Sequence, residues 1–147
     1  METDDNIVEI LFVEDNMNDA EMGIRALKKS ALGAHVLHLQ DGEEAIQFLF
    51  SADIKNLPKL ILLDLKMPKI DGIEVLRRIK SDPARKVIPV VVMTSSREEC
   101  DIVDSYKLGV NAYIVKPVDF DKFTKVISEI GSFWISVNQT PLHNKIK

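Results

Sequence analysis

Five short apolar runs, rich in β-branched residues, recur along the chain, and a helix-like stretch separates each run from the next. Runs of this length and composition are typical of buried strands, and their alternation with helices is typical of an α/β fold with a parallel sheet. The expected strands are residues 7–13, 34–39, 60–65, 87–94 and 112–117. We therefore predict an α/β fold in which the helices cover the sheet.

Apolar residues between the expected strands recur at helical spacing. Residues 20–31 and 123–134 each present one apolar stripe, which predicts amphipathic helices packed on the sheet. Asp41–Glu44, Asp71–Glu74 and Ser96–Glu99 each place a capping residue three positions before a Glu, as in a capping box. Each of the three pairs is therefore expected to mark the start of a helix.

Length and composition restrict the class of protein. The 147 residues suit one domain, and the single Cys100 excludes an internal disulfide framework. No apolar segment at the N-terminus resembles a signal peptide or a membrane span, so we expect a soluble, cytoplasmic protein that has no contact with a membrane. The net charge of −4 lacks the basic excess that binds phosphate backbones, and we expect no DNA binding.

Polar residues stand where the expected strands end. Asp64 follows the apolar run in LILLDLKMPKIDG (residues 60–72), and Pro68 ends that strand because proline has no amide hydrogen for the ladder. Ligands of open parallel sheets bind at the carboxyl ends of the strands. The other polar residues at these ends are Glu14, Asp15, Thr94 and Lys116.

Crowded carboxylates need a compensating charge. Two of them ~4 Å apart repel by about 4 kcal/mol at an effective dielectric near 20. Lys116 could neutralise one, and a hard divalent cation such as Mg²⁺ suits the oxygen ligands of the others. A phosphate on that metal would accept a hydrogen bond from Thr94 and pair with Lys116.

Taken singly, each of these residues has an ordinary structural role. Asp15 could cap the following helix, Glu14 could be an edge charge, Thr94 could simply end a strand and Lys116 could be solvated. Their joint placement at successive strand ends favours a binding site.

The motifs FVEDN, LLDLKMPKIDG, VVMTSS and AYIVKP, in this order and spacing, resemble the CheY-like receiver domain of two-component response regulators. The resemblance implies a single doubly wound (βα)5 domain with strand order 2-1-3-4-5. It covers residues 7–136, which leaves residues 1–6 as an N-terminal extension and residues 137–147 as a C-terminal tail. It also implies a regulatory phosphoacceptor that assists its own phosphorylation and dephosphorylation and is not an enzyme in the usual sense.

The same resemblance assigns roles to the strand-end residues. Asp64 would accept a phosphoryl group from a histidine kinase or a phosphotransfer protein, and Thr94 and Lys116 would bind that group. Tyr113 would couple the site to a switch surface on the fourth helix, fifth strand and fifth helix, and the Lys116–Pro117 bond would be cis. The implied Mg²⁺ ligands are Glu14, Asp15, Asp64 and the backbone carbonyl of Lys66.

Within this family the stretches LRRIKSDPARKVIPVVVMTSS and GVNAYIVKPVDFDKF, with the absence of an output domain, look most similar to stand-alone receivers that serve phytochrome-type histidine kinases. Phe133 and Trp134 could extend a homodimer contact, or their rings could cover the domain's own core. The Lys66 ammonium could protect the phosphoryl group from water, or it could extend into solvent.

Other functions fit the sequence less well. A phosphatase of the haloacid-dehalogenase type needs a second acid where Lys66 stands, and a flavodoxin-like module needs hydroxyls where Glu14 and Asp15 stand. A phosphate-independent interaction module would have lost the acceptor or the lysine. His35 and His38 point to opposite faces of a strand and form no metal site, and Cys100 is interpreted as a structural thiol.

Overall fold

The computed structural model describes residues 7–31, 34–52, 54 and 56–141, and its five strands form one parallel sheet in the order β2-β1-β3-β4-β5. The predicted fold class and strand order are thus confirmed. In chain order the elements are β1 Ile10–Val13, α1 Met17–Ser30, β2 Val36–Leu39, α2 Gly42–Leu49, β3 Leu60–Leu63, α3 Gly72–Ser81, β4 Val90–Thr94, α4 Glu99–Leu108, β5 Ala112–Val115, α5 Phe120–Gly131 and the π-helix η2 Ser132–Val137.

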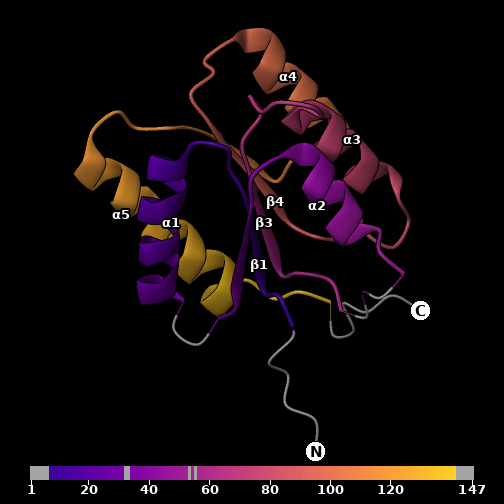
Figure 1. Cartoon of the computed structure of the whole chain (residues 1–147), viewed down its shortest axis with the longest axis horizontal. Helices are drawn as coiled ribbons and strands as arrows, with labels where there is room; N and C mark the ends of the chain where they lie inside the picture. Colours follow the sequence, from indigo (N-terminus) through magenta and orange to yellow (C-terminus); the bar gives the residue numbers. More distant parts are fainter. Residues whose placement is uncertain (1–6, 32–33, 53, 55, 142–147) are drawn as a thin grey trace, which may run out of the picture.

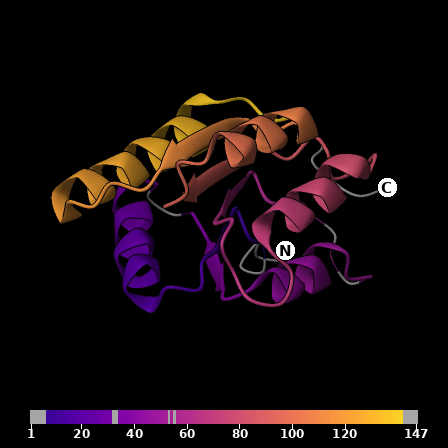
Figure 2. The ribbon, with the colours of Figure 1, turned by 90° about the horizontal axis from the view of Figure 1, so that it is seen from above.

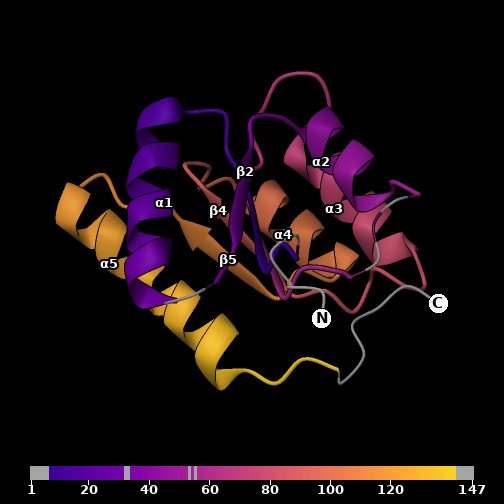
Figure 3. The ribbon, with the colours of Figure 1, turned by 60° about the horizontal axis from the view of Figure 1, so that its bottom comes forward.

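The helices form a layer on each face of the sheet. Helices α1 and α5 pack together on one face, and α2, α3 and α4 lie side by side on the other, as Figures 1 and 3 show. Figure 2 shows the same layers from above. Strands β1, β3 and β4 are fully buried, whereas the edge strands β2 and β5 are half-buried. The continuous apolar runs of the sequence therefore mark the three inner strands.

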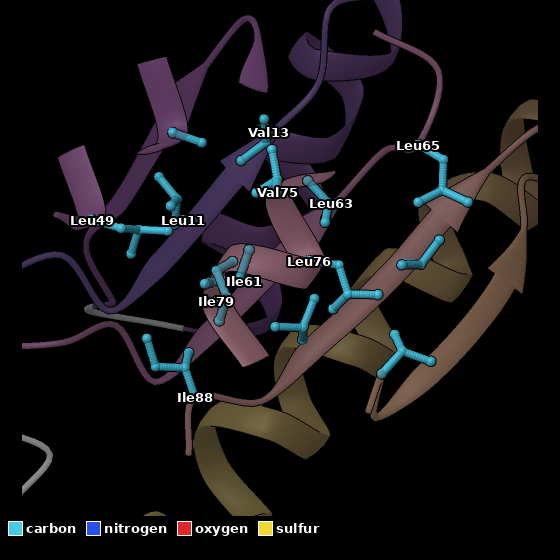
Figure 4. Close-up of a cluster of buried hydrophobic side chains, with 14 of the residues drawn as sticks. Leu11, Val13, Leu49, Ile61, Leu63, Leu65, Val75, Leu76, Ile79 and Ile88 are labelled. Carbon is cyan, nitrogen blue, oxygen red and sulfur yellow. The ribbon is translucent and has the colours of Figure 1, made fainter. Parts of the chain in front are cut away.

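Successive side chains of each inner strand point alternately into two separate hydrophobic cores. Leu11 and Val13 face the layer of α2 and α3, where Figure 4 shows Val13 near Val75 of α3 and Leu11 near Leu49 of α2. Ile10 and Phe12 face the layer of α1 and α5. This alternation follows from the period of two in a strand, and it fixes the register of the sheet, because a slip of one residue would exchange the two faces.

The capping predictions are correct for two helices and wrong for the third. The side chains of Asp41 and Asp71 accept hydrogen bonds from the amides three residues later and cap α2 and α3. Helix α4 instead begins at Glu99 with Glu98 as its N-cap residue. The reason is that the Ser96 hydroxyl donates to the Asp101 carboxylate at 2.5 Å.

Two further expectations concern the C-terminal part of the fold. The described residues contain no cis peptide bond, so the expected cis bond at Lys116–Pro117 is wrong, and this bond has the trans form that X–Pro bonds favour by about 0.5–1 kcal/mol. Trp134 packs against the core under α1 and α5, whereas Phe133 is 48% exposed. The two rings meet edge to face, with their centroids 5.1 Å apart. Of the two rings, only Trp134 covers the domain's own core.

Candidate functional site

The predicted site residues converge at the carboxyl edge of the sheet. Glu14 directly follows β1, Asp64 follows β3, Thr94 ends β4 and Lys116 follows β5. Glu14, Asp64 and Thr94 are buried, with exposed fractions of 1%, 5% and 0%. Buried acids at these positions need partners, and the structure supplies one in Lys116.

The Lys116 ammonium lies among three carboxylates. Its Nζ atom is 2.7 Å from Glu14 Oε1, 3.0 Å from Asp19 Oδ2 and 3.4 Å from Asp64 Oδ2. The alternative interpretation of Lys116 as an ordinary solvated lysine is therefore wrong. One positive charge faces three carboxylates, so the cluster has an excess of acidic groups.

This excess charge and the burial of the site change the pKa of both ion-pair partners. Burial, with the neighbouring Asp64 charge, raises the pKa of Glu14 to about 8 despite the hydrogen bond from Lys116. Burial alone would lower the pKa of Lys116, but its hydrogen bond to Glu14 and the charges of Glu14 and Asp64 raise it above its ordinary value. The edge of the sheet therefore favours any additional cation.

A divalent cation fits the acids of this edge. Glu14, Asp15 and Asp64 each offer a carboxylate oxygen within 4.8 Å of the others, and Asp15 is exposed to solvent. A cavity of about 460 Å³ lined in part by Asp15 and Lys66 opens beside them. An oxygen-only ligand set next to a water-accessible space is what hard divalent cations prefer. Asp15 is also not the cap of α1, because that role falls to Asn16.

The loop after β3 folds tightly around the Asp64 backbone. A Cβ atom on Gly72 would lie 2.2 Å from the Asp64 carbonyl oxygen, and the Gly72 amide donates to the Leu65 carbonyl at 2.9 Å. Lys69 adopts the left-handed conformation with a φ of 66°. The segment LKMPKIDG thus forms a closed turn that packs against the Asp64 backbone at the strand end.

The loop after β4 carries a polar network that the sequence did not reveal. Ser96 donates its amide hydrogen to Thr94 Oγ1 at 3.4 Å, and its carbonyl accepts from the Tyr113 hydroxyl at 3.1 Å. Lys66 Nζ lies 3.3 Å from Asp101 Oδ2, the same oxygen that accepts from the Ser96 hydroxyl. Lys66 is therefore linked through Asp101 and Ser96 to Tyr113; its ammonium pairs with Asp101, while 58% of its side chain remains exposed to solvent.

Sequence reasoning also missed Asp19. Its position in the first turn of α1 looks like an ordinary helix-dipole acid, and only the ion pair with Lys116, 97 residues away, identifies it. Its spacing from Asp15 gave no signal, because Asp15 precedes the helix, which begins at Met17. The His38 ring nitrogen Nε2 lies 2.7 Å from the Glu14 backbone oxygen, which places this histidine beside the candidate site.

Comparison with known proteins decides the family. Residues 10–128 match the family model of the response regulator receiver domain. The chain belongs to the receiver family. It is accordingly a phosphoacceptor response regulator of two-component signalling, a class of regulators that receive phosphoryl groups from histidine kinases and bind divalent metal ions.

Two relatives span nearly the same length as this receiver. It is 42% identical over 135 residues to the response regulator Rcp1 of Synechocystis sp., covering 90% of this chain and 92% of Rcp1. It is 36% identical over 143 residues to the probable methanogenesis regulatory protein FilR2 of Methanothrix harundinacea, covering 96% of this chain and 92% of FilR2.

Solved structures agree with the fold. The phosphorylated cyanobacterial phytochrome response regulator RcpA superposes with a TM-score of 0.84 at 41% identity, covering 92% of this chain and 99% of RcpA. The Mn²⁺-bound form of Rcp1 gives a TM-score of 0.84 at 41% identity, covering 90% of this chain and 97% of that structure. Among the described residues of the receiver, no helix is long and apolar enough to cross a membrane.

Proposed function

We propose that Asp64 is the phosphoacceptor of this receiver and that Mg²⁺ supports the transfer. The observation that carries the proposal is the convergence on Asp64 of the Lys116 ammonium, at 3.4 Å, and the carboxylates of Glu14 and Asp15. The surroundings of Asp64 thus combine a fixed cation with a ligand set for a second, divalent one.

The transfer requires one bond to form and one to break. An Asp64 carboxylate oxygen attacks phosphorus, the phosphorus–nitrogen bond of the kinase phosphohistidine breaks, and the electron pair leaves with the imidazole nitrogen. Lys116 then pairs with one phosphoryl oxygen, and the Thr94 hydroxyl donates to another. The same groups would orient the water that later hydrolyses the acyl phosphate, so the receiver assists both reactions without being a turnover enzyme.

The metal would be held by side chains already at this edge. Glu14, Asp15, Asp64 and the backbone carbonyl of Lys66 would bind Mg²⁺, which supplies charge neutralisation for the phosphoryl oxygens. Mg²⁺ keeps several water ligands, and the exposed Asp15 beside the 460 Å³ cavity leaves room for them.

The partner of this receiver is proposed to be a phytochrome-type histidine kinase, directly or through a phosphotransfer protein. The support is the likeness to RcpA and to further bacteriophytochrome response regulators, one of which is 44% identical over 92% of this chain. Transfer from such a kinase would take place in the cytoplasm. We assign residues 7–136 to the receiver unit, with residues 1–6 as an extension and 137–147 as a tail.

Phosphorylation is proposed to change the surface of α4, β5 and α5, where either a partner or a second copy would bind. Apolar side chains are exposed there on α4 and around the start of α5, namely Val103, Tyr106, Val118 and Phe120. Tyr113 of β5 connects this surface to Thr94 through Ser96. Light scattering at several concentrations, with and without acetyl phosphate, measures whether a homodimer forms.

Mass spectrometry tests the acceptor. Acetyl phosphate with Mg²⁺ should add one phosphoryl group to the wild type and none to Asp64→Asn. Asp104→Asn is a matched control, because Asp104 is exposed on α4 away from the carboxyl edge. Equal labelling of wild type and Asp64→Asn would refute the assignment.

A further inference from the structure

Asp19 differs from the other two carboxylates that contact Lys116. Glu14 and Asp64 belong to the group of acids that can share a metal ion, and Asp19 does not. Asp19 Oδ2 lies 3.0 Å from Lys116 Nζ, and its side chain comes from the first turn of α1, not from a strand end.

The position of Asp19 is fixed by its neighbours. Its backbone amide donates to Asn16 Oδ1 at 3.0 Å, and the Asn16 amide donates to Glu14 Oε2 at 3.2 Å. The turn that begins α1 therefore ties Asp19 to the same strand end that carries Glu14. The carboxylate is about one quarter exposed, at 23%, and Lys116 is more buried, at 12%.

The three N–H groups of Lys116 are matched by three carboxylate partners. A divalent cation bound by Glu14, Asp15 and Asp64 would be coordinated by the carboxylate oxygens of Glu14 and Asp64, which also contact Lys116. The cation would also repel the Lys116 ammonium. Lys116 would then need an acid outside the metal group to stay at the crevice. Asp19 is that acid among the described residues.

We propose that Asp19 is a positioning residue that holds the Lys116 ammonium at the acceptor site while the metal ion is bound. The inference rests on the proposed function, because it takes Glu14, Asp15 and Asp64 as the metal ligands. Asp19 touches neither the acceptor nor the phosphoryl group and acts only through Lys116. It thereby links helix α1 to the phosphoryl-binding cation.

Chemical modification of lysines tests the proposal without phosphorylation. The full chain is treated with a limiting amount of an amine-acylating reagent, with and without saturating Mg²⁺, and labelling of Lys116 is followed by mass spectrometry. In the wild type Lys116 should be protected under both conditions. In Asp19→Ala, Mg²⁺ should remove the protection of Lys116, because the ammonium then lacks a carboxylate partner outside the metal site.

Two variants separate positioning from a general loss of structure. Asp19→Asn keeps an acceptor oxygen and should restore most of the protection of Lys116. Glu21→Ala removes an exposed acid of the same helix and should label like the wild type. Labelling of the exposed Lys107 normalises the reagent dose in every sample.

The outcomes are distinguishable. Equal Lys116 labelling of wild type and Asp19→Ala in Mg²⁺ overturns the role of Asp19, even if Asp64 takes up a phosphoryl group. Exposure of Lys116 in Asp19→Ala with and without Mg²⁺ alike also overturns it, because the metal ion would then have no effect. If Asp64 is not phosphorylated but Mg²⁺ exposes Lys116 in Asp19→Ala, the proposed acceptor fails and the positioning role stands.

Discussion

The Lys66 side chain belongs to the segment that directly follows Asp64, and it is 58% exposed. In the structure it pairs with Asp101, and this pair is accessible to solvent on the Lys66 side, which limits its strength. The phosphoryl group on Asp64 would compete with Asp101 for the same ammonium. Protection of the phosphoryl group by Lys66 is therefore expected to depend on how firmly Asp101 holds it.

We predict that Asp101→Asn slows loss of the phosphoryl group and that Lys66→Ala accelerates it. Each change should be at most about fivefold, because exposed ion pairs contribute no more than ~1 kcal/mol. Decay is followed by mass spectrometry after removal of the phosphoryl donor. The double variant should decay like Lys66→Ala; a double variant as slow as Asp101→Asn would show that Asp101 acts without Lys66.

At the scale of elements, Lys80 connects α3 to the segments that flank it. Its ammonium donates to the carbonyls of Lys86 and Ile88 at 3.0 and 2.8 Å and to Asn111 Oδ1 at 3.2 Å. Asn111 Oδ1 in turn accepts from the Val90 amide at the start of β4. One lysine therefore joins the end of α3, the approach to β4 and the approach to β5.

We expect Lys80→Met to lower the free energy of unfolding by about 1–2 kcal/mol, because it removes three hydrogen bonds, while Asn111 Oδ1 keeps the one from the Val90 amide. Urea unfolding monitored by circular dichroism measures the change. Lys107→Met is the control, since Lys107 is exposed on α4 and no ion pair involves it among the described residues. An equal decrease in the free energy of unfolding of both variants would mean that the hydrogen bonds of Lys80 do not stabilise the fold.

The same lysine predicts a pH dependence. Burial lowers the pKa of Lys80 from 10.5 to about 8 in the folded protein. Between these values the unfolded chain binds a proton that the folded chain has released, so the free energy of unfolding should rise with pH in this window. Wild type should therefore gain stability relative to Lys80→Met from pH 8 to 10.5 in urea titrations. If the free energies of unfolding of the two proteins changed with pH in parallel, the lowered pKa of Lys80 would be contradicted.

At the scale of the whole molecule, metal binding should stabilise the fold. Mg²⁺ at a hundredfold excess over its dissociation constant adds about 2.7 kcal/mol if it binds only the folded state. We expect the melting temperature of the wild type to rise across a millimolar titration and that of Asp15→Asn to rise less. Asp104→Asn should respond like the wild type, and a wild type that melts at the same temperature throughout would refute the metal site.

The sequence was sufficient for the fold because each inner strand is an uninterrupted apolar run followed by a polar residue. Glu14, Asp64, Thr94 and Lys116 could be placed together for the same reason, since parallel strands bring their carboxyl ends to one edge. Asp19, Asp101 and Ser96 lie beyond the strand ends, and their roles depend on side-chain directions in loops and first helical turns. Those directions follow from packing, which local sequence patterns do not encode.

The separation of Lys116 from its partners along the chain bears on synthesis of the protein from its N-terminus. Glu14, Asp19 and Asp64 precede Lys116 by 52 residues or more. A nascent chain that has formed β1 and β3 thus brings Glu14 and Asp64 together without Lys116, and their mutual repulsion opposes closure of the sheet's carboxyl edge. The addition of β5 both completes the sheet and delivers the missing cation, so the last strand to leave the ribosome is also the one that makes this edge electrostatically stable.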